Sequence, residues 1–160
     1  MKKPSKIKVV TAKKAHLLLS NFRSITLFGV VYCNRQSDIE LINKNDTIDS
    51  TLKCHETIHV RQAENTKNSW FLFYLNYAWH WILNFPLFFI WTHLPYKFIP
   101  YEVEAYANEN NFKYPYRIAN QWRMFKKKLT FKKKWKYAKQ YKKSSMTFCE
   151  FVNEVILKEI

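Results

Sequence analysis

Two histidines with a glutamate between them stand in the stretch CHETIHVRQ, residues 54–62. On an α-helix, residues four apart share one face with their Cβ atoms about 5–6 Å apart, so His55 and His59 can bind one metal ion through their ring nitrogens. Glu56 points about 100° away from His55 around the helix axis and would border that ion. From there it could take a proton from a metal-bound water, whose pKa zinc lowers to about 7. The pattern predicts a zinc site suited to hydrolysis.

A zinc site of this kind needs a third protein ligand, and the stretch YEVEAYANE, residues 101–109, supplies carboxylates. It follows an apolar excursion that could return the chain to the first helix. Glu102 is the first candidate for the third ligand, and Glu104 is the alternative. Because the two glutamates lie two residues apart, they point from different faces of a helix and cannot both bind the same ion.

The two segments together resemble the gluzincin metallopeptidases, in particular the branch in which HExxH is followed by E-x-x-A-D. That branch includes the CAAX prenyl proteases and HtpX-type membrane proteases, and the peptidase domain of β-lactam sensor receptors has a related pattern. The resemblance covers residues 51–109 and rests on five residues: His55, Glu56, His59, Glu102 and Ala105. It implies that the two histidines and Glu102 bind zinc, that Glu56 is the general base, and that the small Ala105 permits close packing of the two helices.

One residue departs from this pattern, because Tyr106 stands where the branch has an aspartate that orients a histidine. A tyrosine hydroxyl can also accept from an imidazole N–H, or donate to a developing oxyanion, so Tyr106 is a candidate catalytic residue. The chain is also similar to short uncharacterised bacterial proteins with an HExxHxxQ helix and an FEREAY-like segment. That similarity would include Gln62, one turn beyond His59, for which a helix-surface position is the alternative.

The segments before the histidines predict a β-hairpin over residues 24–43. SITLFGVVYC is β-branched and aromatic, turn-rich NRQSD follows, and IELI is a second short apolar run. In the polar loop NKNDTIDS, Asp49 or Ser50 can cap a helix over residues 51–68 that carries the histidines. Asp46 and Asp49 are weaker metal-ligand candidates, for which loop and cap positions are the simpler interpretation.

An apolar aromatic segment, residues 70–96, follows, and residues 68–96 contain no charged side chain. Asn76, His80 and Asn84 recur every four residues and form one polar stripe on a helix that Pro86 should break. His80 is another weak candidate for the metal site or for a helper in catalysis, although membership of this stripe is simpler.

The length of this segment makes a membrane span an alternative. A single crossing by residues 70–94 would separate the histidines from Glu102 by about 37 Å and would exclude a shared metal. The zinc interpretation therefore requires a helical hairpin broken near Pro86, either dipping into a membrane or buried in a domain.

After the predicted third-ligand helix, residues 101–111, the C-terminal region of residues 112–160 is strongly basic. Between Asn110 and Cys149 there are many lysines and arginines and no acid, and the whole chain has a net charge of +15. Such a surface attracts an anionic membrane surface or nucleic-acid phosphate, and nucleic acid is the less favoured partner. Interleaved aromatic residues could insert at a membrane, stack on bases or simply pack.

Composition bounds the remaining expectations. One glycine and five prolines in 160 residues disfavour a turn-rich β fold, so the predicted class is mainly α (α+β) in a single domain, residues 1–160. One glycine also excludes Gly-rich nucleotide-binding loops. The three cysteines are scattered, and the basic N-terminus lacks the apolar core of a signal peptide, which favours a cytoplasmic location with membrane association as an addition.

These observations predict a zinc-dependent metallopeptidase acting on a peptide or protein substrate. A hairpin just upstream of the HExxH helix would stand where zincin peptidases bind extended substrates along a sheet edge. The alternative is a non-enzymatic basic protein that binds a membrane or nucleic acid and has a structural or vestigial metal site.

Overall fold

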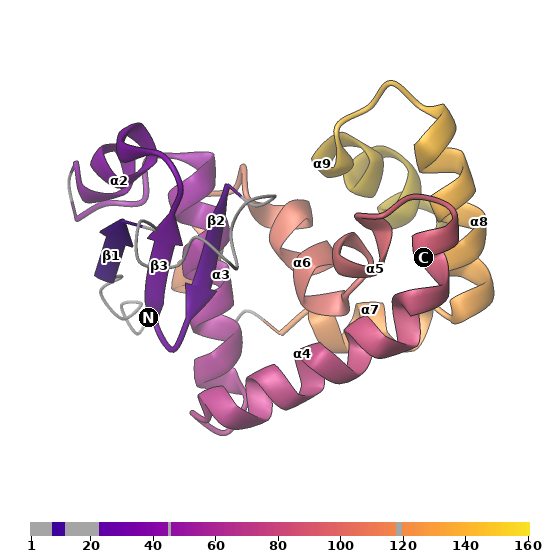
Figure 1. The fold of residues 1–160 in the computed structure, drawn as a ribbon, viewed down its shortest axis with the longest axis horizontal. Coiled ribbons are helices and arrows are strands. Elements are labelled where there is room, and N and C mark those ends of the chain that lie inside the picture. Colours follow the sequence, from indigo (N-terminus) through magenta and orange to yellow (C-terminus); the bar gives the residue numbers. More distant parts are fainter. Residues whose placement is uncertain (1–7, 12–22, 45, 118–119) are drawn as a thin grey trace. The chain divides into compact units, whose positions relative to one another are not determined.

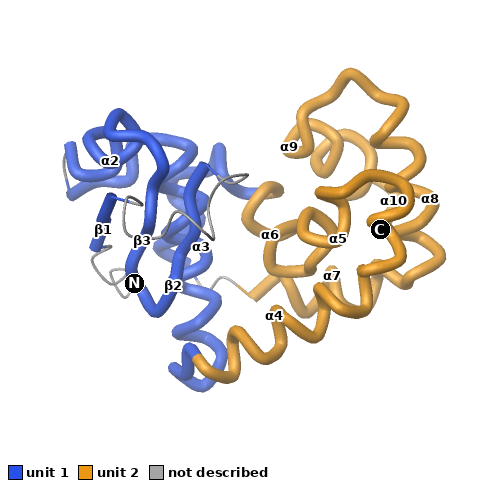
Figure 2. The backbone as a smooth tube through the Cα atoms, viewed as in Figure 1, with its two compact units in different colours: residues 1–70, 108–119 blue, residues 71–107, 120–160 orange. Residues whose placement is uncertain are grey.

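The fold of the computed structural model is mainly helical with a small N-terminal sheet, which confirms the predicted α+β class (Figure 1). The structure describes residues 8–11, 23–44, 46–117 and 120–160. The chain divides into two compact units (Figure 2). Unit 1 comprises residues 1–70 and 108–119, and unit 2 comprises residues 71–107 and 120–160.

The sheet of unit 1 contains β1 (Lys8–Thr11), β2 (Ser24–Leu27) and β3 (Val30–Cys33) in the order β1-β3-β2. β3 pairs in parallel with β1 and antiparallel with β2. Phe28 and Gly29, with φ angles of 50° and 77°, join β2 to β3 in a two-residue turn. Positive φ at both positions matches the right-handed twist of a hairpin, and it explains why the single glycine stands there.

The hairpin is shorter than predicted, and its predicted second strand is wrong. Both strands lie within residues 24–33, whereas IELI belongs to α2 (Gln36–Asn43). Ile39 and Ile42, three residues apart, are buried in one cluster with Val31 and Cys33. This spacing suits one face of a helix and not alternate positions of a strand.

The helix that carries the histidines is α3 (Thr51–Asn65), which confirms the predicted helix and its start. Ser50 is the N-cap, and its Oγ accepts a hydrogen bond from the backbone N–H of Lys53 at 3.3 Å. Every residue from Lys53 to Ala63 is buried. The helix ends three residues before the predicted end, and Lys67 and Asn68 both have a φ of 53°.

The segment of unit 1 that follows residue 107 packs along α3 and includes the short helix η3 (Tyr114–Tyr116). Thr51 donates to the side chain of Asn110 at 3.1 Å, near the start of α3. Arg61 donates to the carbonyl oxygen of Arg117 at 3.4 Å, near its end. The returning chain is therefore attached at both ends of the helix.

In the described residues of unit 2, every regular element is a helix. Its elements are α4 (Trp70–Asn84), η2 (Phe85–Phe89), α5 (Leu94–Lys97), α6 (Pro100–Asn108), α7 (Trp122–Lys128), α8 (Phe131–Lys143), α9 (Phe148–Phe151), η4 (Val152–Ile156) and α10 (Leu157–Glu159). The aromatic segment is interrupted near Pro86, as predicted. The helix α4 ends at Asn84, and a 3-10 turn that contains Pro86 follows. None of the helices in the described part of the chain has the length and apolar character needed to span a membrane.

The core of unit 2 joins these helices around large apolar side chains. Its buried members include Leu87, Leu94, Phe98, Val103, Phe125, Tyr137, Phe148 and Phe151. Elements from both halves of the unit therefore share one core, and the basic C-terminal region is a packed part of the fold.

The C-terminal members of the polar stripe of α4, His80 and Asn84, are buried in unit 2. Asn84 is fully buried, its Nδ2 donates to the carbonyl of Pro95 at 3.0 Å, and its Oδ1 accepts from Nζ of Lys134 at 2.8 Å. Burial lowers the pKa of Lys134 to about 8. Burial also lowers the pKa of His80 to about 4, with a further contribution from the positive charges of Lys134 and Lys126.

We expect Asn84→Ala to destabilise the protein strongly, because it leaves the Lys134 ammonium and the Pro95 carbonyl buried without Asn84 as their partner. The free energy of unfolding should fall by about 3 kcal/mol in a denaturant titration. Asn76→Ala is the matched control, since Asn76 only donates to Leu72 O within the partly exposed first half of α4. Equal losses in the two variants would contradict this role of Asn84.

The depressed pKa of His80 predicts a specific pH dependence. Its folded pKa of about 4 lies below the ordinary value of 6.5. Between these values the unfolded chain binds a proton that the folded chain does not, so the free energy of unfolding should fall as pH is lowered from 6.5 to 4. His80→Gln should reduce this slope in urea titrations. Parallel curves for the wild type and the variant would show that His80 does not cause it.

Candidate metal centre

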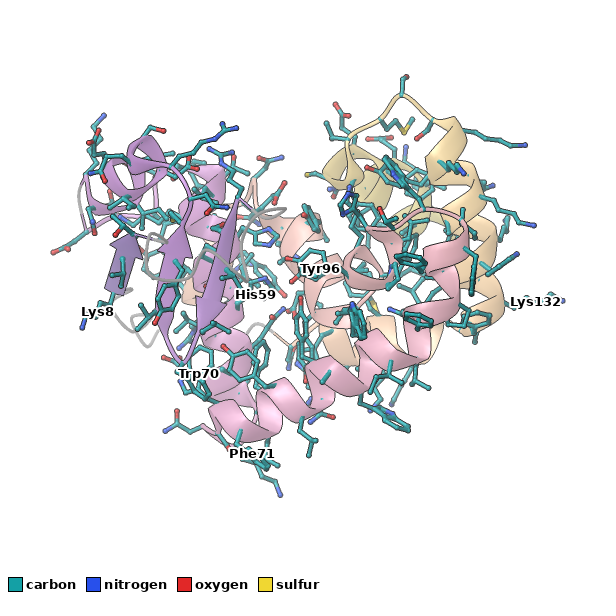
Figure 3. All side chains as sticks on the ribbon, viewed as in Figure 1. Lys8, His59, Trp70, Phe71, Tyr96 and Lys132 are labelled. Carbon is teal, nitrogen blue, oxygen red and sulfur yellow. The ribbon has the colours of Figure 1, made fainter. Side chains whose placement is uncertain are left out.

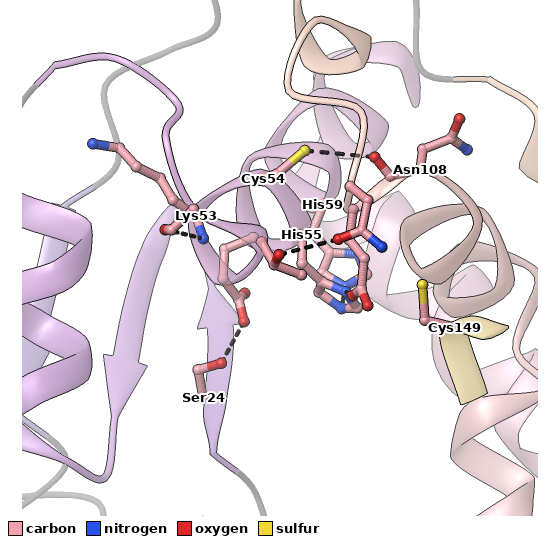
Figure 4. Close-up of polar contacts among 12 residues, drawn as sticks. Ser24, Lys53, Cys54, His55, His59, Asn108 and Cys149 are labelled. Carbon is pink, nitrogen blue, oxygen red and sulfur yellow. Dashed lines mark hydrogen bonds and ion pairs between the residues drawn. The ribbon is translucent and has the colours of Figure 1, made fainter. Parts of the chain in front are cut away.

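The two histidines of the HExxH segment converge on one face of α3, as the spacing predicted. Their Nε2 atoms lie 3.2 Å apart, and the two rings meet edge to face at 4.9 Å between centroids. Both side chains are buried, with only 8% of His55 and 6% of His59 exposed. Figure 4 shows the two rings together beside the end of the chain segment that carries Asn108.

The other ring nitrogen of each histidine faces an acceptor. Nδ1 of His55 lies 2.8 Å from Oε2 of Glu109, and Nδ1 of His59 lies 2.8 Å from Oε1 of Gln62. An ionised carboxylate and an amide oxygen only accept, so both Nδ1 atoms carry the ring proton. In the neutral rings the lone pairs are then on the two Nε2 atoms that face each other. A metal cation between them, or a proton on one of them, relieves this repulsion.

The candidate carboxylate ligand, Glu102, lies on α6 of unit 2 and is also buried. Within that unit, Tyr77 on α4 donates its hydroxyl to Oε1 of Glu102 at 2.7 Å. Burial, together with the Glu102 charge, raises the pKa of Tyr77 well above its usual value, so the phenol keeps the proton that it donates. His55, His59 and Glu102 form a group of buried side chains that could hold a metal ion.

Glu104, the alternative third ligand, has a structural partner of its own. Its Oε1 accepts from the backbone N–H of Gln121 at 2.8 Å, and its Oε2 accepts from that of Trp122 at 3.2 Å. These amides stand at the start of α7, where backbone N–H groups lack helical acceptors. Glu104 therefore caps α7, and it is not part of the group that could hold a metal.

Glu56, the predicted general base, is held by the sheet of unit 1. Ser24 Oγ donates to Oε1 of Glu56 at 2.5 Å, and Thr26 Oγ1 donates to Oε2 (Figure 4). Ser24 and Thr26 are alternate residues of β2, so both side chains are on the face that contacts α3. The carboxylate is thereby oriented by two hydroxyls while each oxygen retains a second lone pair.

The remaining predicted candidates lie outside this group. Tyr106 packs its ring edge to face on Phe148 at 5.0 Å in unit 2, and it lies near enough to Tyr77, the partner of Glu102, to help raise the pKa of Tyr77. His80 lies near Lys134 in the same unit. Asp46 and Asp49 are exposed in the loop before α3.

Two cysteines lie near the centre but do not suit nucleophilic chemistry. Burial raises the pKa of Cys54 to about 12, and the charge of Glu109 adds to this effect. Burial likewise raises the pKa of Cys33 to about 12, with contributions from Glu56 and Asp38. Without a metal both thiols keep their protons at neutral pH, and the nucleophile is the thiolate.

Sequence reasoning missed several partners of the candidate residues. The HExxHxxQ spacing signalled Gln62, whose contact with His59 the structure now supplies. Glu109 closes the YEVEAYANE stretch, and its position seven residues after Glu102 was the available signal. Nothing in the sequence marked Tyr77, Ser24 or Thr26, since their contacts depend on tertiary packing.

Comparison with known proteins gave no match: no protein-family model, no curated protein and no solved structure matches this chain. The resemblance to the gluzincin metallopeptidases therefore rests on the residues of the chain alone.

Proposed function

We propose that this protein is a zinc-dependent hydrolase of the peptidase type, with His55, His59 and Glu102 as zinc ligands and Glu56 as the general base. The observation that carries the proposal is the 3.2 Å separation of the two Nε2 atoms, with both Nδ1 atoms engaged by acceptors. Two nitrogens bound to one tetrahedral zinc at 2.0–2.1 Å stand about 3.3 Å apart. The pair is thus preorganised at the distance that zinc requires.

The continuity of α6 supports Glu102 as the third ligand. The helix runs from Pro100 to Asn108, and Glu109, which contacts His55, follows it directly. Seven residues therefore separate Glu102 from the residue that contacts His55, so one short stretch of chain carries both carboxylates.

The outer contacts of the ligands suit the same chemistry. A carboxylate or amide that accepts from the far nitrogen of a histidine fixes its tautomer and increases its basicity as a ligand. Glu109 and Gln62 occupy these positions. Tyr77 donates to Oε1 of Glu102 and so fixes the orientation of this carboxylate.

Bound zinc would polarise a substrate carbonyl and lower the pKa of water to about 7. In this proposal Glu56 accepts the proton released at that step, and Ser24 and Thr26 hold its carboxylate in position. The Tyr106 hydroxyl is the proposed donor to the developing oxyanion.

A peptide or protein is the proposed substrate because of the position of β2. It is the outer strand of the order β1-β3-β2, and among the described residues no strand pairs with its other edge. An extended peptide can add to such an edge through backbone hydrogen bonds. The same strand carries Ser24 and Thr26, so a peptide on this edge would run past Glu56.

Metal content tests the proposed ligands. We expect about one zinc ion per chain in elemental analysis of protein that was never exposed to a chelator. His55→Ala and His59→Ala should lose the ion, and Glu102→Gln should weaken its binding at least about tenfold. Glu104→Gln is the matched control, because it should lower stability through the α7 cap and leave the zinc in place. A folded wild type without metal would refute the site.

Activity tests the base separately. Glu56→Gln should keep the zinc, because Glu56 is not a ligand, and should abolish cleavage of a peptide library detected by mass spectrometry. Retained cleavage in Glu56→Gln would assign the proton transfer to another group. Zinc binding by a wild type that cleaves no peptide would refute the peptidase step while leaving the metal site intact.

The outer contacts lead to a further expectation. Glu109→Gln and Gln62→Leu should each weaken zinc binding by about 10- to 100-fold in competition with a chromophoric chelator, because they loosen the orientation of one imidazole. Glu64→Gln is the control on the same helix, since Glu64 pairs with Arg61 at 2.5 Å. An equal effect of Glu64→Gln would indicate general loosening of α3.

A further inference from the structure

Unit 2 has a broad exposed apolar face on α4 and η2. Phe71, Leu75 and Ile82 recur along the outward side of α4, and each has more than half of its surface exposed. Figure 3 shows the side chain of Phe71 pointing away from the ribbon. On η2, Phe89 is 80% exposed, and Trp79 extends the face on the helix. We refer to these five side chains and their exposed neighbours between residues 71 and 91 as the aromatic face.

In α4 the distribution of buried and exposed residues is the reverse of that in a typical surface helix. Such a helix normally buries its apolar residues and directs polar ones to solvent. Here the buried residues of α4 include His80 and Asn84, and the outward residues are phenylalanine, leucine, isoleucine and tryptophan. Exposed apolar areas of more than a few hundred Å² mark interaction sites.

Lysines border the aromatic face at the end of η2. Nζ of Lys142 donates to the carbonyl of Ile90 at 2.7 Å, and Trp91 stacks on Tyr141 of α8 at 5.9 Å. These contacts place the basic C-terminal turn of α8 beside the face, with Lys139 and Lys143 exposed nearby on the same helix. The chain has no acidic residue between Asn110 and Cys149 to neutralise this border.

We propose that unit 2 docks on an anionic lipid bilayer, with the aromatic face inserted at the interface and the α8 lysines over the lipid phosphates. An apolar face bordered by cations fits such a surface, because the apolar side chains can enter the acyl-chain region while the lysines meet the anionic lipid phosphates. The 15 residues of α4 span about 22 Å, less than the roughly 30 Å hydrocarbon core, so the helix lies along the interface.

Lipid explains the face better than nucleic acid does. Bases stack on aromatic rings within a cationic groove, whereas this face mixes rings with leucine and isoleucine and has no charged residue between positions 68 and 96. Tryptophan and phenylalanine beside lysine are the residues of interfacial helices.

Vesicle flotation of the full-length protein tests the proposal. We expect binding to vesicles of phosphatidylcholine with about a quarter phosphatidylglycerol, and much less to phosphatidylcholine alone. Phe71→Ser/Phe89→Ser should weaken binding at least tenfold. Phe28→Ser is the matched control, since Phe28 is 68% exposed in the hairpin turn of unit 1. Its binding should equal that of the wild type.

Charge variants separate the two parts of the interaction. Lys139→Glu/Lys143→Glu should reduce binding by at least about 30-fold at low salt, from about 1 kcal/mol for each lysine lost, and the difference should shrink at high salt. Urea midpoints equal to that of the wild type would show that the variants fold. His59→Ala should bind vesicles normally, which separates this proposal from the zinc site.

Three results would overturn the docking proposal. The first is an absence of binding to the anionic vesicles. The second is a wild-type dimer in light scattering that Phe71→Ser/Phe89→Ser converts to monomer, without vesicle binding by either protein, because a second copy would then cover the face. The third is binding to a single-stranded oligonucleotide but not to vesicles.

Discussion

The interaction on which unit 1 depends is the meeting of two imidazole rings on one helix face. The two Nε2 atoms face each other at 3.2 Å, and acceptors at both Nδ1 atoms hold the two rings in this orientation. Gln62 reaches His59 from the next turn of α3, whereas Glu109 comes from the segment that returns after α6. The candidate centre therefore requires the return of the chain as much as the helix itself.

The burial of α3 is tolerated because its polar side chains are paired within unit 1. Glu56 receives two hydroxyl donors from β2, Arg61 pairs with Glu64, and Cys54 donates to the carbonyls of Asn108 and Asn111 at 3.6 Å. Charged groups without such partners would each cost several kcal/mol. The sheet and the segment that returns after α6 thus stabilise a buried helix in which about half of the residues are polar.

Local signals were enough to predict part of this structure. The cap at Ser50 and the break at Pro86 depend on residues adjacent in sequence, so the start of α3 and the end of α4 were predicted correctly. IELI was assigned to a strand because short apolar runs do not distinguish strand from helix. β1 and the contacts of Glu109 and Tyr77 were not predicted, since their partners are distant in sequence and set by packing.

In the aromatic segment, α4 buries polar residues and exposes apolar ones. In the interior of unit 2, Lys134 donates to Asn84 of α4. Because this polar side of α4 faces inward, its opposite side lies at the surface. Each large apolar side chain left in water forgoes roughly 1.5–3 kcal/mol of burial. The lipid docking proposed for unit 2 would cover several of them, on a helix without a single charge. The exposed lysines at the end of α8 are positively charged, which is why the surface proposed to cover this face is an anionic one.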